Sequence, residues 1–317
     1  MSKFPSFTKT WHHSPTAAFD PRSSSLSAEG KVVLVTGAGS GIGKATAFAF
    51  ANARARAVII TGRTQSSLNG AKTEIEQAAT AQSHEHFQCL AFSVDITNPK
   101  AVDQVFTQVG QKFGKIDVLI SNAGYLDKHS LITDSDLDDY WQCFETNVKG
   151  ALIVIKAFLR THPHVTSSST DSNCPASSKP VIINISTGAA HISPPILSTF
   201  SAYASSKLAA LHVFSFLHAE HTDTLSVFNL QPGEIPTAMA KKGHRDMAKD
   251  DVRLPAHWCV WLAAKAESDA AFLKGRLVWA NWDLEELLAR REEVENGDLL
   301  NIELKGWGEE FVEKFID

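Results

Sequence analysis

The stretch Val32-Val33-Leu34-Val35-Thr36-Gly37-Ala38-Gly39-Ser40-Gly41-Ile42-Gly43 joins an apolar β-branched run to a run of small residues with helical character. In a strand–turn–helix unit of this kind, Gly37 permits a tight turn, Gly41 lets the backbone approach a pyrophosphate, and Gly43 lets the helix pack closely on the sheet. The first N–H groups of the helix would hold the anion, with Ser40 and Ile42 beside it. A glycine-rich loop alone is also compatible with a plain tight turn, so the interpretation depends on the rest of the chain.

The rest of the chain repeats the same alternation of elements. Further apolar runs occupy residues 57–61, 88–94, 116–120, 180–185, 225–230 and 275–279, and helix-length stretches separate them, the longest at about 135–160 and 201–220. This order predicts an α/β, Rossmann-type, doubly wound fold, in which a seven-stranded parallel sheet lies in a three-layer αβα arrangement. Strands buried on both faces explain why the runs are apolar without interruption.

Composition limits the classes of function. The 317 residues are 44% hydrophobic and carry a formal net charge of −5 without a basic block, so we expect no nucleic-acid partner. The four cysteines are scattered, which indicates reduced thiols in a reducing compartment. The sequence contains neither an apolar run of about 18 residues nor an evident secretory signal, so we expect no membrane association and assign the cytoplasm by elimination.

The domain organisation follows from shifts in pattern. Residues 1–29 predict an N-terminal arm on the surface, pinned by Trp11 and Phe19, and residues 30–282 predict a single Rossmann domain. Within that domain, the Ser/Thr/Pro-rich residues 161–179 predict a flexible insertion and residues 238–256 a substrate lid. Residues 283–317 predict a docked C-terminal extension because large apolar side chains recur at helical spacing there.

Five motifs occur in order between about residues 30 and 280. They are Thr36-Gly37-x-x-x-Gly41-x-Gly43, Asp95, Ser121-Asn122-Ala123-Gly124, Tyr203-x-x-x-Lys207 and Pro232-Gly233-x-Ile235-x-Thr237. With these motifs the chain resembles the short-chain dehydrogenase/reductase family. The N-terminal arm and the segment Trp279-Ala280-Asn281-Trp282 also resemble a fungal branch of that family. The resemblance implies a nicotinamide cofactor and hydride transfer.

The catalytic prediction centres on Tyr203 and Lys207. They are four positions apart in a helical stretch and therefore project from one face. A free phenol titrates at about 10, and a neighbouring ammonium together with an oxidised nicotinamide ring lowers that pKa. Tyr203 can then exchange a proton with a carbinol oxygen, and the family resemblance assigns Lys207 to the nicotinamide ribose as well. A surface tyrosine beside a solvated lysine is the alternative interpretation.

Two further catalytic assignments follow from the resemblance. Family members carry two serines at the end of the strand predicted at 180–185, and the second orients the substrate oxygen. That position is Thr187 here, and the interval to Tyr203 is longer than usual, so the donor is Thr187, Ser186 or neither of them. Asn147 matches the family's helix asparagine, which holds a water that relays protons to the lysine; a helix-surface asparagine is the alternative.

The end of the strand at 57–61 bears on cofactor choice. An acidic residue there would select NAD(H), but the chain has Gly62, then Arg63 and Thr64, which leave room for a 2′-phosphate and offer it a guanidinium and a hydroxyl. We therefore expect NADP(H); with Arg63 turned to solvent, NAD(H) is the alternative. The resemblance places Asp95 and Ile96 at the adenine, Asn122, Ala123 and Gly124 beneath the nicotinamide ribose, Pro232 and Gly233 at a turn, and Ile235 and Thr237 at the nicotinamide amide.

These assignments predict an NADP(H)-dependent ketoreductase that interconverts a ketone and a secondary alcohol, with specificity set by residues 188–200 and the 238–256 lid. An apolar small-molecule substrate and a tailoring step in secondary metabolism are expected by analogy. A non-redox isomerase, cyclase or lyase on the same scaffold, or a nucleotide sensor without turnover, are the alternatives. No metal site is predicted, because His84-x-His86 lacks a third ligand. The family resemblance implies a homodimer or homotetramer formed through the helices at 135–160 and 201–220.

Overall fold

The computed structural model describes residues 6–82, 84, 86–166, 179–242 and 248–304. Its seven strands form one parallel sheet in the order β3-β2-β1-β4-β5-β6-β7, which confirms the predicted fold class. The strands are β1 Val32–Thr36, β2 Ala57–Gly62, β3 Gln88–Ser93, β4 Val118–Ser121, β5 Val181–Ile185, β6 Ser226–Gln231 and β7 Leu277–Trp279. The strand order reverses between β1 and β4, and ligands of such sheets bind at the carboxyl ends of the strands beside this point.

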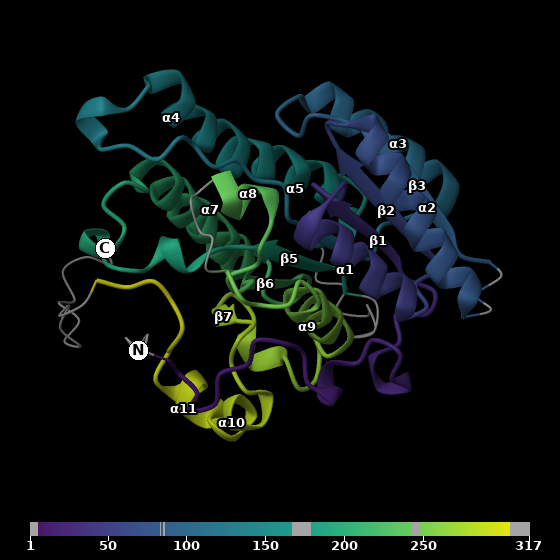
Figure 1. The fold of residues 1–317 in the computed structure, drawn as a ribbon. Coiled ribbons are helices and arrows are strands. Elements are labelled where there is room, and N and C mark those ends of the chain that lie inside the picture. The colour runs from purple at the N-terminus through teal and green to yellow at the C-terminus, as the bar shows by residue number, and fades with distance from the viewer. Residues whose placement is uncertain (1–5, 83, 85, 167–178, 243–247, 305–317) are drawn as a thin grey trace.

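Helices cover both faces of the sheet (Figure 1). They are α1 Gly41–Asn52, α2 Gln65–Ala81, α3 Pro99–Phe113, α4 Leu137–Phe144, α5 Ala151–Arg160, α6 Pro163–Thr166, α7 Ser201–Glu220, α8 Ala238–Lys242, α9 Arg253–Ala264, α10 Leu284–Ala289 and α11 Arg291–Asn296. Along β1, Val33 and Val35 belong to a core shared with α1, α2 and α9, whereas Val32 and Leu34 belong to a core shared with α3, α5 and α7. Alternation of side chains therefore buries every residue of the strand.

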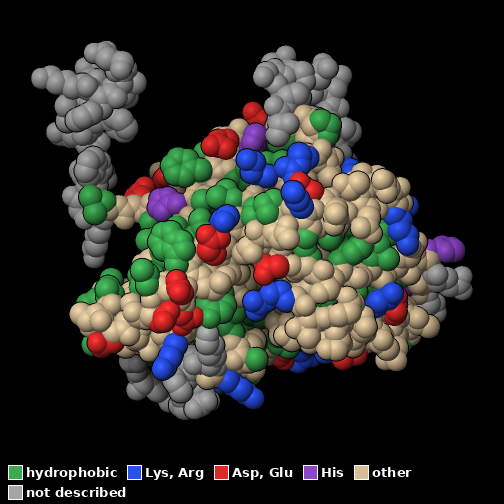
Figure 2. Space-filling model, turned by 90° about the horizontal axis from the view of Figure 1, so that it is seen from above, with side chains coloured by type: hydrophobic (Ala, Val, Ile, Leu, Met, Phe, Trp, Pro, Cys, Tyr) green, Lys and Arg blue, Asp and Glu red, His purple; other side chains and the backbone are tan. Residues whose placement is uncertain are grey.

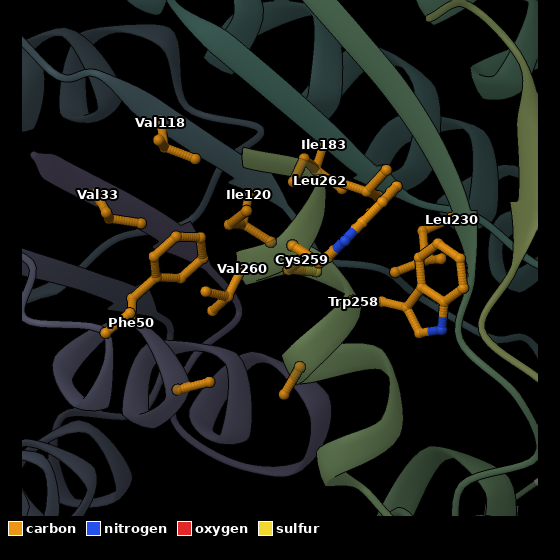
Figure 3. Packing of buried hydrophobic residues seen from close by; sticks show 14 of the residues in the cluster. Val33, Phe50, Val118, Ile120, Ile183, Leu230, Trp258, Cys259, Val260 and Leu262 are labelled. Atoms are coloured by element: carbon orange, nitrogen blue, oxygen red, sulfur yellow. The ribbon is translucent and has the colours of Figure 1, made fainter. Parts of the chain in front are cut away.

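Helix α9 fills the centre of one core and was not predicted. Figure 3 shows Trp258 of α9 next to Leu230 of the sheet, and Leu262 of α9 next to Ile183. Residues 258–262 are all buried, so the helix lacks the amphipathic period by which helices are identified in sequences. The predicted lid at 238–256 overlaps this helix, and buried Leu254 ties its last residues to the core; residues 243–247 lie outside the described residues.

The long helix predicted at 135–160 is interrupted. A π-helical turn over Glu145–Gly150 separates α4 from α5 and carries Asn147. The side chain of Asp136 caps α4 by accepting the Asp139 N–H at 2.9 Å. A π-turn inserts one residue into the helical register and is frequent at functional sites.

The N-terminal arm and the C-terminal extension pack against each other beside β7 (Figure 1). Trp11 forms an isolated antiparallel bridge with Trp282, and Phe19 is buried against Trp258 with ring centroids 4.5 Å apart. Most of the predicted insertion at 161–179, and the far end of the extension, lie outside the described residues. Among the helices that are described, none is both long and apolar enough to cross a bilayer.

Candidate active site

A cleft of about 350 Å³ lies over the carboxyl ends of β1, β2, β4, β5 and β6. Predicted residues that line it are Gly37, Ser40, Gly41, Ile42, Arg63, Thr64, Asp95, Ile96, Asn122, Ala123, Gly124, Ser186, Tyr203, Lys207, Pro232 and Thr237. Five other predicted residues, Gly43, Asn147, Thr187, Gly233 and Ile235, do not line the cleft. The last three of these line a neighbouring cavity instead. The structure thus gathers residues from all five motifs at one edge of the sheet.

The glycine loop has the shape that a dinucleotide phosphate requires. Gly37 has φ +66°, and a Cβ there would lie 2.9 Å from the Ala123 Cα. Gly41, the first residue of α1, has φ +55°. A Cβ on Gly43 would lie 2.5 Å from the Asn122 side-chain nitrogen and 2.6 Å from the Gly37 carbonyl oxygen. Gly37, Ser40 and Gly41 line the cleft at the N-terminus of α1, where an anion is favoured.

The ends of β1 and β4 are fastened together by polar groups. The Thr36 hydroxyl accepts the N–H groups of Asn122 and Ala123, both at 3.0 Å. The Asn122 side-chain nitrogen returns a hydrogen bond to the Thr36 carbonyl at 2.8 Å. The first and third motifs consequently form one rigid unit, in which Ala123 and Gly124 present small surfaces to the cleft.

Lys207 is a buried amine at the centre of the site. Its Nζ donates to the carbonyl oxygen of Ile185 at 2.7 Å, and only 7% of the residue is exposed. Burial lowers the pKa of Lys207 to about 8, because a charged amine loses hydration in the interior. Gly124 lies beside it, since a Cβ there would be in ordinary contact with Nζ at 3.8 Å. The amine therefore faces the part of the cleft nearest to β4.

Tyr203 lies one turn before Lys207 on α7, as predicted. It lines both the cleft and a second cavity of about 840 Å³. Other residues that line both spaces are Ile42, Ser186, Pro232, Thr237 and Met239. Tyr203 thus lies at the boundary between the cleft and the second cavity.

The two candidate hydroxyl donors differ in their contacts. The Thr187 oxygen accepts the Ala189 N–H at 3.2 Å, which fixes the oxygen and leaves the hydroxyl hydrogen available. The Ser186 oxygen is buried and has no hydrogen-bond partner among the described residues. Thr187 lines the second cavity only, whereas Ser186 lines the cleft as well.

Asn147 is buried behind the cleft, and its amide is hydrogen-bonded within the chain. The amide oxygen accepts the Tyr125 N–H at 2.7 Å, and the amide nitrogen donates to the Tyr125 carbonyl and to the Ser206 hydroxyl, each at 2.9 Å. Ser206 in turn donates to the carbonyl of Tyr203 at 2.9 Å. Asn147 therefore connects the end of the β4 loop to the turn of α7 that carries Tyr203.

The corner at the end of β2 carries no carboxylate. Gly62 ends the strand, and exposed Arg63 and Thr64 line the cleft after it. The Asp95 carboxylate, which follows the neighbouring strand β3 and also lines the cleft, accepts the Thr97 N–H at 2.9 Å and the Thr97 hydroxyl at 2.8 Å. Among the described residues, no cluster of three or more His, Cys, Asp or Glu side chains could hold a metal ion.

A family model described as short chain dehydrogenase matches residues 31–248. The chain belongs to the short-chain dehydrogenase/reductase family. The short chain dehydrogenase mpl6 of Monascus purpureus is 33% identical over 279 residues, which cover 87% of this chain and 89% of the relative. The short chain dehydrogenase pigC of Monascus ruber is 29% identical over 302 residues, covering 93% and 92%. The predicted fungal branch is thus confirmed.

Solved structures agree with this fold. A short chain dehydrogenase from Salmonella enterica superposes with a TM-score of 0.67 at 21% identity, over 81% of this chain and 98% of that one. NAD+-bound xylitol dehydrogenase superposes with a TM-score of 0.64 at 24% identity, over 80% and 98%. Family members are oxidoreductases that use nicotinamide cofactors, act on small molecules and form oligomers. The glycine loop, the cleft and the buried amine of Lys207 fit such a cofactor, and the second cavity has room for a small molecule.

Sequence reasoning missed part of the second cavity. Lys9, Trp11 and His13 of the arm line it, together with Asp250 and Trp279. The only available signal was the presence of tryptophans in the arm and after β7, far apart in the sequence. Nothing in their spacing indicates that the two segments meet.

Gly43→Ala tests whether the glycine loop binds the dinucleotide. The new methyl group would collide with the Asn122 amide and the Gly37 carbonyl, so the dissociation constant for the dinucleotide should rise about tenfold or more. Gly110→Ala is the matched control, because a Cβ at that position in α3 meets nothing within 4 Å. Titration calorimetry compares both variants with the wild type, and equal affinities would contradict the role of Gly43.

Proposed function

We propose that this family member is an NADP(H)-dependent oxidoreductase that interconverts a ketone and a secondary alcohol. The observation that carries the proposal is the place of Tyr203, between the cleft and the second cavity and one helical turn from a buried lysine. A nicotinamide held in the cleft would supply or accept a hydride at the carbonyl carbon. Tyr203 supplies or accepts the proton at the carbonyl oxygen, so each turnover moves one hydride and one proton.

Lys207 makes the phenol a usable acid and base. A cationic amine next to the Tyr203 hydroxyl favours the phenolate, and an oxidised nicotinamide ring adds to the effect. The hydrogen bond to the Ile185 carbonyl holds Nζ in place at the cleft. Asn147, through Ser206, holds the turn of α7 that carries Tyr203, and the family's water relay to the lysine belongs to the same proposal.

Thr187 is the proposed donor to the substrate oxygen. It faces the second cavity together with Tyr203, and its oxygen is oriented by the Ala189 N–H. Ser186 is the alternative donor to the substrate oxygen, because its buried hydroxyl has no hydrogen-bond partner among the described residues. Since Ser186 also lines the cleft, its hydroxyl is better placed to meet the cofactor.

The preference for NADP(H) is supported by the corner after β2. Gly62 leaves space there, and exposed Arg63 is suited to a bidentate contact with a 2′-phosphate. A dehydrogenase that selects NAD(H) would place a carboxylate at this corner to accept the ribose hydroxyls. The remaining predicted contacts, Asp95 and Ile96 to adenine and Ile235 and Thr237 to the nicotinamide amide, belong to the same proposal.

A self-association surface is supported by exposed apolar side chains on the predicted helices. Figure 2 shows hydrophobic side chains gathered toward one side of the face that it presents. Leu137 and Trp141 of α4 are 75% and 56% exposed, and Phe216 of α7 is 65% exposed. We propose that these helices form the contacts of a homodimer or homotetramer, which the molar mass in solution tests.

The proposed setting is cytoplasmic secondary metabolism. The three described cysteines that the structure records as free, Cys89, Cys143 and Cys259, are all buried, as befits a reducing compartment. The second cavity is large and partly aromatic, which favours an apolar carbonyl compound as substrate. A tailoring role rests on analogy with fungal relatives.

Loss of NADPH absorbance with a panel of ketones tests the function directly. Tyr203→Phe should lower the turnover number by a factor of about 100 to 10,000 while the affinity for NADPH stays unchanged, because only the proton donor is removed. Tyr140→Phe on α4 is the matched control and should retain full activity. A product of unchanged mass would indicate an isomerase or lyase, and NADPH binding without any turnover would indicate a sensor.

Arg63→Asp tests cofactor choice. Losing the phosphate contact and adding a negative charge should shift the ratio of kcat/KM for NADPH over NADH on the order of a hundredfold toward NADH. Lys112→Asp reverses a charge at the far end of α3 and should leave the ratio unchanged. If the ratio does not move in Arg63→Asp, the proposed phosphate contact is wrong.

Removing each hydroxyl separately tests the donor. Thr187→Val keeps the shape of the side chain and should lower the turnover number about a hundredfold or more, while Thr187→Ser should retain most of the activity. Ser186→Ala should cost less than tenfold, on the order of one lost hydrogen bond. Single-turnover kinetics at saturating NADPH gives the comparison. The reverse ranking would assign the role to Ser186, and two mild effects would exclude both.

A further inference from the structure

The N-terminal arm reaches the second cavity although it precedes the Rossmann domain. Trp11 lines the cavity together with Lys9 and His13, on the same space as Tyr203. Figure 1 shows the purple arm beside the yellow α10 and α11. The arm therefore does more than cover the core, because its side chains line the same cavity as Tyr203.

The arm is fixed by contacts on both sides of Trp11. Upstream of it, the Glu286 carboxylate accepts the Lys9 N–H at 2.5 Å and the Thr10 hydroxyl at 2.6 Å. Downstream, the His12 N–H donates to the Asn281 carbonyl, and the Asn281 side chain donates to the His12 carbonyl, both at 2.8 Å. Trp11 is therefore held in a defined position, so little conformational entropy is lost when a ligand contacts it.

A buried carboxylate links the arm to the turn after β6. His13 Nδ1 lies 2.5 Å from one oxygen of Asp250, and the other oxygen accepts the Glu234 N–H at 2.6 Å and the Asn281 side chain at 2.9 Å. Gly233, in the same turn, has φ +94°, and a Cβ there would lie 2.5 Å from that second oxygen. The arm is thus joined to the turn that carries the fifth motif.

Aromatic contacts extend from the arm to the proposed hydroxyl donor. The ring of Trp11 packs against Trp279 with centroids 5.7 Å apart. Trp279 covers Gly188, where a Cβ would lie 2.8 Å from the indole, and its Nε1 donates to His191 at 3.2 Å. Gly188 follows Thr187 directly in the chain. A pair of indoles therefore forms the cavity wall that begins beside Thr187.

We propose that Lys9, Trp11 and His13 of the arm belong to the substrate site, and that Trp11 and Trp279 together contact a fused-ring aromatic ketone or alcohol. The proposal rests on the proposed function for the identity of the reacting group. A cavity of about 840 Å³ is in the upper part of the range that encloses drug-sized ligands, so it has room for more than one ring. Stacking of a substrate ring on the indoles adds affinity beyond apolar burial.

Two ketones that differ by one fused benzene ring, 1-tetralone and cyclohexanone, provide the test. Trp11→Ala should lower kcat/KM for 1-tetralone about tenfold, mainly by raising KM, and should change kcat/KM for cyclohexanone less than about twofold. Trp11→Phe should restore most of the loss. Phe7→Leu is the control. Phe7 belongs to the same arm and contacts Trp282 and Arg290, but it does not line the cavity.

A binding measurement separates this inference from the proposed function. Calorimetric titration with 1-naphthol needs no turnover, and Trp11→Ala should weaken that binding about tenfold while NADPH affinity and circular dichroism stay unchanged. Trp11→Leu replaces Trp11→Ala if the latter does not fold. The inference would be overturned if the Trp11 variants reduced 1-tetralone as well as the wild type does. It would also be overturned if the wild type bound neither 1-tetralone nor 1-naphthol. Trp11-dependent naphthol binding without any hydride transfer would overturn the proposed function alone.

Discussion

The hydrogen bond from Lys207 to the carbonyl of Ile185 is the interaction on which the site depends. It places a poorly hydrated amine at the end of β5, with a pKa lowered to about 8 by burial. An amine in this position is costly unless a negative partner is available. The phenolate of Tyr203 and the anionic cofactor are the partners that the cleft can offer. In the proposed function, a buried ammonium at this point would therefore favour the ionised form of the Tyr203 phenol.

The remaining structure keeps the groups around this amine in place. Hydrogen bonds between Thr36 and Asn122 fasten β1 to β4, so the glycine loop is held against the segment that follows β4. Asn147 ties the β4 loop to α7, which carries both Tyr203 and Lys207. Reaction geometry tolerates little displacement, and these links come from elements far apart in the sequence. The parallel sheet brings them to one edge because every strand ends there.

Local patterns were sufficient to predict the sheet and the cleft. Strand β1, the glycine loop and the spacing of Tyr203 and Lys207 are short-range features that can be recognised in the sequence, and the other motifs along the chain support their interpretation. Helix α9 was missed because it is buried on all sides and shows no amphipathic period. The arm's place at the cavity was missed because it depends on contacts with Asn281 and Glu286, more than 260 positions away in the chain. Such pairings leave no periodic signal.

The central claim is that the lysine lowers the pKa of Tyr203, and an ultraviolet titration of phenolate absorbance in the NADP+ complex tests it most directly. The chain has three tyrosines, and hydrogen bonding to Asp139 raises the pKa of Tyr125 to about 12, out of the relevant range. The account predicts a tyrosine that ionises well below about 10 in the wild type, shifts upward in Lys207→Met and disappears in Tyr203→Phe. An identical titration curve in Lys207→Met would contradict it.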